Sequence, residues 1–214
     1  MAARTSNSLA SIIDKRIDTS SYREQHWEGT FWDYLDIVQQ NPAVARNAFQ
    51  RTYDMIMSFG SESFTQFKQE LKRYKFFSDP IGEGADAIFG LERPLTQLVD
   101  FFKSASANYG TEKRILLLHG PVGSSKSTIA RLLKKGLEAY SRTDDGKLYT
   151  FSWRVPHKVG ADEGEHYVDC PMHEDPLLLI PIGAREEVLS EINSSLPDGR
   201  RVKLYADILS LIHI

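Results

Sequence analysis

Cysteine is nearly absent from this chain of 214 residues, in which Cys170 is the only one. A single cysteine cannot form a disulfide within the chain, so the class of small secreted proteins held together by disulfides is excluded. Long apolar runs are missing as well. The longest, Ile115–Leu118 and Leu177–Ile180, are far shorter than the ~18–20 residues that a membrane-spanning helix needs. Because the N-terminal run Leu9–Ile13 is also too short for a signal peptide, we expect a cytoplasmic protein with no membrane contact.

The sequence also has no excess of charge of one sign. It carries 26 Lys and Arg residues against 29 Asp and Glu residues, a formal net charge of −3. Without a basic block there is no electrostatic basis for non-specific nucleic-acid binding, so we expect no nucleic-acid partner. What the sequence does have is 41% hydrophobic and 11% aromatic residues, a composition typical of a globular protein with a sizeable core.

Apolar residues recur at helical spacing in four segments, and we expect helices over residues 42–60, 64–74, 91–109 and 128–140. Asn41 followed by Pro42 predicts the start of the first helix, because an Asx side chain caps a helix and proline fits its first position. A break rich in Pro and Gly over residues 76–84 separates this helical N-terminal segment from the rest of the chain.

Strand signals follow in the second half of the chain. The run Arg114–His119 is continuously apolar between charged ends, a pattern typical of a central parallel strand that is buried on both faces. Residues Leu148–Trp153 alternate enough to be the next strand, and Asp144-Asp145-Gly146 before them is interpreted as a turn rather than as catalytic carboxylates. Helices that alternate with strands predict an α/β fold with a largely parallel sheet.

A phosphate-binding loop lies between the predicted strand Arg114–His119 and the helix that follows it. It consists of Gly120, Pro121, Val122, Gly123, Ser124, Ser125, Lys126 and Ser127, with Thr128 continuing the helix. The spacing matches G-x-x-x-x-G-K-[ST], in which backbone N–H groups and the helix N-terminus hold phosphates. Lys126 would reach the β- and γ-phosphates of ATP, and the hydroxyl of Ser127 would bind Mg²⁺.

Ser125 occupies the position where this motif usually has its second glycine. A non-glycine residue held at positive φ costs about 1–2 kcal/mol, so the loop geometry is expected to be strained there. The alternative is that a Ser-rich turn merely caps a helix with an exposed lysine. We favour the phosphate loop because strand, loop and helix stand in the order that the motif requires.

The loop resembles that of AAA+ ATPases, and its surroundings resemble a narrower family. The string GPVGSSKSTI at residues 120–129, preceded by EKRILLLH and followed by CPMHEDP at residues 170–176, is similar to the PrkA family of serine protein kinases. Phe77-Ser78-Asp79-Pro80 and Ile88-Phe89-Gly90-Leu91-Glu92 fit the same family, and the resemblance covers about residues 20–205. Ser125 is then a feature of the family.

This resemblance implies a fold, cofactors and partners. It implies a P-loop NTPase of AAA+-like α/β class, with a parallel sheet, helices and a helical N-terminal segment. ATP and Mg²⁺ would be the cofactors, Ile88, Phe89 and Gly90 would contact the adenine, and AAA+ contacts would form a homo-oligomer that acts on a protein substrate. Simple helix-entry packing is the alternative role for residues 88–90.

The implied domain organisation has four parts. Residues 1–20 are expected to be a mobile arm, 21–80 the helical segment, and 81–208 an AAA+ core. The Asp-Glu strand, sensor and arginines of such a core are not recognisable after residue 140, so we interpret the core as truncated and its catalytic residues as unknown. Residues 209–214 leave the family pattern, resemble translated adapter sequence and are interpreted as non-native.

His166, Cys170 and His173 could suggest a zinc site, but their number and irregular spacing do not match structural zinc sites. We favour a proline-braced loop in which Cys170 is a small buried residue. Three functions remain open: a PrkA-type serine kinase, an AAA+ remodelling motor, and a nucleotide-responsive binding module.

Overall fold

The computed structural model describes residues 26–66, 68–159, 162–204 and 207–208. The α-helices are α3 (Phe31–Gln40), α4 (Ala48–Ser58), α5 (Glu92–Ser106), α6 (Lys126–Tyr140) and α7 (Ile182–Asn193). The strands are β1 (Ser61–Gln66), β2 (Gln69–Tyr74), β3 (Ser152–Val159) and β4 (Asp162–Asp169). Short 3₁₀ helices are η1 (Pro42–Ala45), η2 (Lys75–Ser78), η3 (Thr111–Lys113), η4 (Asp144–Gly146), η5 (Pro176–Leu179) and η6 (Asp198–Arg200). None of the described helices is long and apolar enough to span a membrane.

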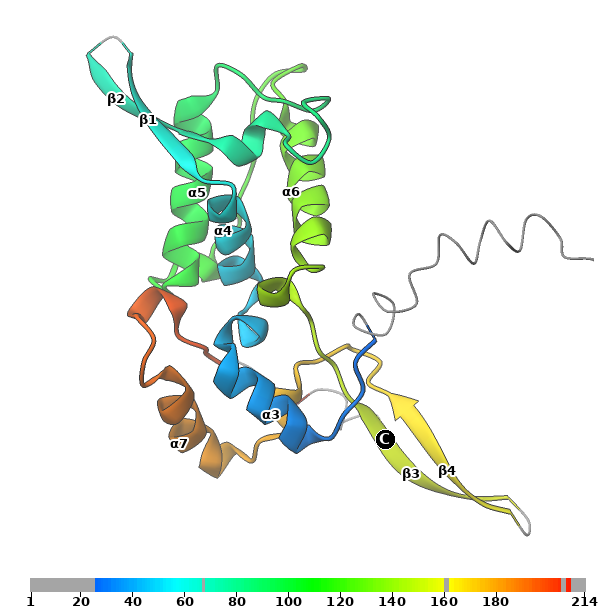
Figure 1. Cartoon of the computed structure of the whole chain (residues 1–214). Helices are drawn as coiled ribbons and strands as arrows, with labels where there is room; N and C mark the ends of the chain where they lie inside the picture. The colour runs from blue at the N-terminus through cyan, green and yellow to red at the C-terminus, as the bar shows by residue number, and fades with distance from the viewer. Residues whose placement is uncertain (1–25, 67, 160–161, 205–206, 209–214) are drawn as a thin grey trace, which may run out of the picture.

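Helices α4, α5 and α6 pack side by side and enclose the larger hydrophobic core (Figure 1). Each helix contributes apolar side chains at three- and four-residue spacing, such as Leu95, Leu98 and Val99 on α5. Gly136 of α6 allows a close approach, because a Cβ there would lie 2.6 Å from the ring of Phe76 and 2.7 Å from Sδ of Met55. The helices on either side of the phosphate loop are therefore anchored in one core.

A smaller core joins the beginning of the described chain to its end. Tyr34 and Val38 of α3 pack with Leu177 of η5 and with Val202, and all four are buried. The larger core likewise combines residues from before and after residue 80. The predicted domain boundary near residue 80 stays a prediction, and the predicted parts at residues 1–20 and 209–214 lie outside the described residues.

The helix predicted over residues 42–60 is interrupted. Asn41 accepts a hydrogen bond from the backbone N–H of Ala43, as predicted, but the turn that it caps is the 3₁₀ helix η1. Asn47 then begins α4 with a capping box, in which its side chain and that of Gln50 each accept from the other's backbone N–H. The second cap is stronger than the first because it satisfies two helix-end donors reciprocally.

The helix predicted over residues 64–74 was wrong, because this segment is a β-hairpin. Strand β1 pairs antiparallel with β2, and Phe64 lies opposite Leu71. Lys68 in the connection has a φ of 62°, a turn conformation that a helix does not contain. Residues seven apart can face each other over two helical turns or across a tight hairpin, so the apolar spacing fits both structures.

The parallel sheet is not confirmed. Among the described residues, strands pair only in the two antiparallel hairpins β1–β2 and β3–β4. The segment Ile115–Leu118 has no strand partner there, and Ile115 and Leu117 are 94% and 79% exposed. A hairpin needs only a short connection, whereas a strand buried on both faces needs neighbours from distant parts of a chain. The fold is mixed α/β, as predicted, without the predicted sheet.

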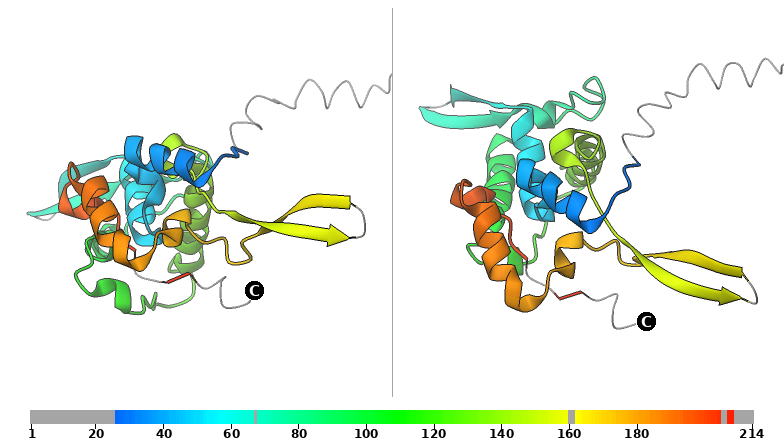
Figure 2. Two further views of the ribbon diagram at one scale, coloured as in Figure 1. Left: turned by 90° about the horizontal axis from the view of Figure 1, so that it is seen from below. Right: turned by 60° about the horizontal axis from the view of Figure 1, so that its bottom comes forward.

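The strand predicted over Leu148–Trp153 begins later and pairs differently. Strand β3 starts at Ser152 and pairs antiparallel with β4, with Ser152 opposite Asp169. Both views in Figure 2 show this hairpin projecting away from the helical body. The preceding residues Asp144–Gly146 form η4, and Lys147 pairs with Asp144, so the interpretation of these carboxylates as part of a turn holds.

Candidate functional site

The phosphate loop runs directly into α6, which begins at Lys126. Gly123 and Ser125 both have positive φ, at 84° and 57°. Ser125 therefore adopts the left-handed conformation that glycine adopts without cost and serine does not. The strain expected at this position is present, and the loop keeps its turn without the second glycine.

The ammonium of Lys126 lies over the loop. Its Nζ donates to the carbonyl oxygens of Gly120 at 2.7 Å and Pro121 at 2.6 Å, and to the hydroxyl of Ser124 at 2.9 Å. The side chain thus folds back toward the turn in front of its own helix. This position brings a cation to the point where the loop would hold an anion.

Backbone donors of the loop are available to a ligand. No described residue accepts a hydrogen bond from the backbone N–H groups of Gly123, Ser125, Lys126 or Ser127. The first helical N–H group that is paired belongs to Ile129, which donates to the carbonyl of Ser125 at 2.8 Å. Free N–H groups at a helix N-terminus, together with the helix dipole, favour a bound anion.

Gly120 lies close to the side chains of Ser124 and Lys126. A Cβ on Gly120 would lie 2.7 Å from Oγ of Ser124 and 3.9 Å from Nζ of Lys126. A larger residue would push apart the groups that face the phosphate position. The loop residues therefore fit a nucleotide phosphate, and the exposed hydroxyl of Ser127 is accessible to a Mg²⁺ ion bound to it. Thr128, the third residue of α6, is half-buried, and Pro121 and Val122 are exposed.

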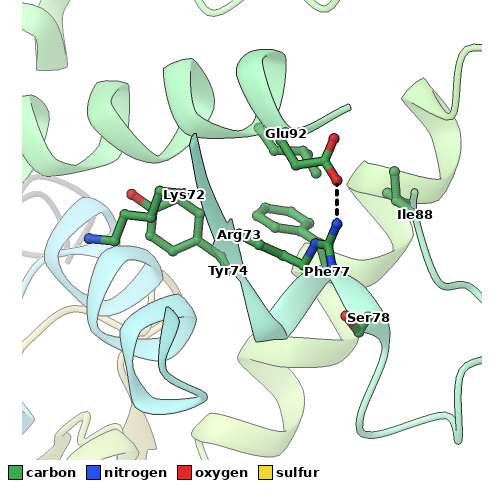
Figure 3. A pocket seen from close by; sticks show the side chains of 8 residues that line it. Lys72, Arg73, Tyr74, Phe77, Ser78, Ile88 and Glu92 are labelled. Carbon is green, nitrogen blue, oxygen red and sulfur yellow. Dashed lines mark hydrogen bonds and ion pairs between the residues drawn. The ribbon is translucent and has the colours of Figure 1, made fainter. Parts of the chain in front are cut away.

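The predicted adenine contacts lie at the end of the loop that follows η2. Ile88 is buried in the larger core and donates its backbone N–H to the carbonyl of Phe77 at 2.9 Å, whereas Phe89 is 77% exposed. Gly90 has a φ of 73°. Figure 3 shows Ile88 beside Phe77 at a small pocket that also contains the ion pair between Arg73 and Glu92. A contact of residues 88–90 with adenine stays a prediction.

A polar network that the sequence did not reveal connects this loop to α6. Asp79 is buried, with a φ of 52°, and its carboxylate accepts from the backbone N–H of Gly82 at 2.9 Å and of Asp86 at 3.0 Å. Nζ of Lys135 on α6 donates to both carboxylate oxygens, at 3.0 and 3.3 Å. In the sequence, Ser78-Asp79-Pro80 before two glycines indicates only a break between segments.

Asp86, in the same loop as Asp79, forms a second ion pair with α6. The guanidinium of Arg131 donates to both oxygens of Asp86, from Nε at 3.0 Å and from Nη2 at 2.5 Å. The backbone N–H of Asp86 lowers the pKa of Asp79, and Lys135 lowers it further. The hydrogen bond from Arg131 likewise lowers the pKa of Asp86. Both carboxylates are therefore held in the ionised form.

The segment Cys170–Pro176 is a loop next to the smaller core, with Cys170 and Pro176 buried and residues 171–173 exposed. Cys170 is fully buried, as expected, and its Sγ accepts a hydrogen bond from the backbone N–H of Glu174 at 3.4 Å. Asp175 accepts from the hydroxyl of Tyr34. In the described part of the chain, no group of three or more His, Cys, Asp or Glu side chains is placed to hold a metal ion.

The geometry of the loop before α6 fits the P-loop class of nucleotide-binding proteins. The chain belongs to the PrkA AAA domain family, whose match covers residues 29–201. This confirms the family predicted from the strings at residues 112–129 and 170–176. It also supports nucleotide binding, because AAA domains bind ATP. The chain has no significant match among solved structures.

Relatives carry different functional names. The chain is 41% identical over 182 residues to a Bacillus subtilis protein named ATP-dependent protease PrkA, covering 84% of this chain and 25% of that protein. It is 37% identical over 106 residues to an uncharacterised Geobacillus stearothermophilus protein in the gldA 5′ region, covering 98% of that protein. It is 29% identical over 110 residues to the serine/threonine kinase YeaG of Escherichia coli K12, covering 17% of that protein. This chain thus spans about a quarter of the length of its Bacillus subtilis relative.

Proposed function

We propose that this chain binds Mg-ATP and forms the ATP-binding part of a PrkA-type enzyme that acts on proteins. The observation that carries the proposal is the loop before α6, where the ammonium of Lys126 lies against the loop carbonyls and backbone N–H groups at the start of the helix are unpaired. A cation, free donors and a helix N-terminus together suit a polyphosphate better than any other common ligand.

Each residue of the site has a distinct role in this proposal. Lys126 would exchange its bonds to the loop carbonyls for the β- and γ-phosphate oxygens, because a charged acceptor is the stronger partner. Ser127 would bind Mg²⁺ through its hydroxyl, and residues 88–90 would contact the adenine. When bound, Mg²⁺ would neutralise charge on the phosphates.

Titration of the chain with a fluorescent ATP analogue tests the phosphate role. We expect Lys126→Ala to weaken binding by about 1.5–3 kcal/mol, or roughly 10- to 150-fold, because a charge-assisted contact is lost. Lys134→Ala is the matched control, since Lys134 is an exposed lysine of the same helix. Equal affinities of Lys126→Ala and the parent chain would refute the proposal.

The role of Ser127 is tested separately by comparing titrations with and without Mg²⁺. Ser127→Ala should reduce the gain in ATP affinity that Mg²⁺ provides, and Ser127→Thr should retain it because threonine keeps the hydroxyl. An unchanged Mg²⁺ dependence in Ser127→Ala would remove this residue from the metal site.

For the whole protein we propose transfer of the γ-phosphate of ATP to serine of a protein substrate in the bacterial cytoplasm. Support comes from the name of the Escherichia coli relative and from the strings GPVGSSKSTI and CPMHEDP. Radiolabelled ATP incubated with the whole protein and cell extract should label serine, and Lys126→Ala should abolish the labelling. Labelling that persists in Lys126→Ala would contradict the kinase proposal.

ATP-dependent proteolysis is the second candidate, favoured by the name of the Bacillus subtilis relative, which is similar over most of this chain. In that case ATP hydrolysis would drive remodelling of a protein partner. The whole protein would then degrade a test protein such as casein in an ATP-dependent way without labelling it. Either activity fits a homo-oligomer in which an arginine of one subunit completes the next subunit's site.

We also propose that Ile115–Leu118 belongs to a parallel sheet in the whole protein. Exposure of Ile115, Leu116 and Leu117 on one segment is unusual, because adjacent large apolar side chains generally mark a surface that becomes covered. The position of the run directly before the phosphate loop is the one that a P-loop strand occupies.

A further inference from the structure

Two ion pairs connect the loop over residues 79–90 to α6, the helix that begins with Lys126. Figure 1 shows this loop, which follows η2, lying alongside α6. Lys135 pairs with the buried Asp79, and Arg131 pairs with Asp86. The helix is thus linked to the loop at two points, one turn apart.

Asp79 organises the loop from within. Besides its carboxylate contacts, its backbone carbonyl accepts from the N–H groups of Gly82 at 3.2 Å and Gly84 at 2.9 Å. Gly82 is packed so closely that an added Cβ would lie 2.0 Å from Nζ of Lys135 and 2.3 Å from Oδ2 of Asp79. The side chains of Lys135 and Asp79 therefore pack closely against the loop at Gly82.

The far end of the loop is fixed by the core. Ile88 is buried, and its backbone N–H donates to the carbonyl of Phe77. This hydrogen bond joins the two ends of the segment from residue 77 to residue 88. Phe89 and Gly90 follow at once, and Phe89 is exposed. The ion pairs of Asp79 and Asp86 with α6 would therefore also fix the position of residues 88–90 relative to the N-terminus of that helix.

We propose that Asp79–Lys135 and Asp86–Arg131 are positioning pairs, which hold residues 88–90 at a fixed place relative to the phosphate loop. The base and the phosphates of a nucleotide would then bind to one rigid body. The inference rests on the proposed function, because it needs phosphate at Lys126 and the base at residues 88–90. In this proposal Asp79, Asp86, Arg131 and Lys135 act on the nucleotide only through the position of residues 88–90.

The test compares a ligand that has a base with one that has none. Affinities of the whole chain for ATP and for inorganic tripolyphosphate are measured by calorimetry, for the parent, Arg131→Gln and Lys135→Met. Both variants should bind ATP about two- to thirtyfold more weakly, the range of typical coupling energies, and tripolyphosphate as well as the parent does. A purely structural role would weaken both ligands together.

A charge exchange provides the rescue. The double variant Asp86→Arg with Arg131→Asp should recover most of the ATP affinity lost in Arg131→Gln, because both groups are partly exposed and the pair can form in reverse. Arg142→Ala is the matched control. It removes an exposed ion pair with Glu138, near the other end of α6, and should change neither affinity.

The outcomes separate the two proposals. A parent chain that binds neither ligand would refute the proposed function itself. A parent that binds both ligands equally would leave phosphate binding intact and refute the base contact, and with it this inference. Three other results would also overturn the inference. Arg131→Gln and Lys135→Met could weaken binding of both ligands equally, or they could leave the ATP affinity unchanged. The double variant could also bind ATP no better than Arg131→Gln does.

Discussion

The hydroxyl of Tyr34 donates a hydrogen bond of 2.9 Å to Oδ1 of Asp175, which lies 141 residues further along the chain. The same oxygen accepts from the backbone N–H of Leu177 at 2.8 Å and so caps η5. One carboxylate therefore fastens α3 to the segment Cys170–Pro176. This gives a structural role to a string that the sequence marked as typical of the family without indicating what it does.

Asp175 gives the stability of the chain an unusual pH dependence. Burial raises the pKa of Asp175, against the lowering effect of the Leu177 N–H and the Tyr34 hydroxyl. The folded state then holds the proton more tightly than the unfolded state. The contribution of Asp175 to the free energy of unfolding therefore falls as pH rises above about 4, the ordinary pKa of an aspartate. Asp79 has a lowered pKa, so its contribution has the opposite sign and is lost as pH falls.

We expect Asp175→Asn to remove the first of these contributions. Urea unfolding of the parent and the variant at pH values from 4 to 8 should show the stability difference shifting in favour of the variant as pH rises. The amide keeps an acceptor for Tyr34, so the hydrogen bond itself is preserved. Two stability curves that run parallel over this range would show that Asp175 does not titrate as described.

Tyr34→Phe tests the same contact from the other side. The ring stays in the smaller core while the donor is lost, so the free energy of unfolding should fall by about 1 kcal/mol. Tyr109→Phe is the control, because Tyr109 is 79% exposed and its change should alter stability by less than about 0.5 kcal/mol. Equal effects of the two substitutions would mean that the bond to Asp175 contributes nothing.

Gly136→Ala should destabilise the larger core. The added Cβ would meet the Phe76 ring and the Met55 sulfur well inside van der Waals distance, and such overpacking costs typically about 1–3 kcal/mol. Gly183→Ala in α7 meets nothing within 4 Å, so it should leave stability unchanged or raise it by up to about 1 kcal/mol. The midpoints of thermal unfolding of both variants test this prediction. An unchanged midpoint for Gly136→Ala would show that α6 packs less closely against Phe76 and Met55 than described.

The sequence predicted the helices that have a strong local period. Helices α5 and α6 lie close to the predicted ranges, because their apolar residues recur over four turns and face one core. The hairpin over Ser61–Tyr74 was missed because its apolar residues are few and their spacing fits both structures. Pairing of strands is a non-local property that spacing along the chain does not specify.

The phosphate-binding motif is recognisable in the sequence because its chemistry depends on neighbouring residues in a fixed order. The contacts of Asp79 with Lys135 and of Tyr34 with Asp175 were not predictable, since each joins residues far apart in sequence. A buried aspartate beside Pro80 is indistinguishable in sequence from an exposed turn residue. Only the fold shows that its carboxylate meets a lysine.

Ser125 offers a direct measurement of the strain in the phosphate loop. Its φ of 57° costs a serine about 1–2 kcal/mol relative to its relaxed conformation, and glycine at this position has no such cost. Glycine also increases the entropy of the unfolded chain, which offsets part of the gain. Ser125→Gly should therefore stabilise the chain by up to about 1 kcal/mol, seen as a higher midpoint of thermal unfolding.

Ser124→Gly is the matched control for this prediction, because it adds the same flexibility one residue earlier at a position without positive φ. It also removes the hydroxyl that donates to Pro121 and accepts from Lys126, so it should destabilise the loop. The ATP affinity of Ser125→Gly should stay within about twofold of the parent, since the loop already has the conformation that the motif requires. If Ser125→Gly and Ser124→Gly lowered the unfolding midpoint equally, the left-handed conformation of Ser125 would carry no measurable strain.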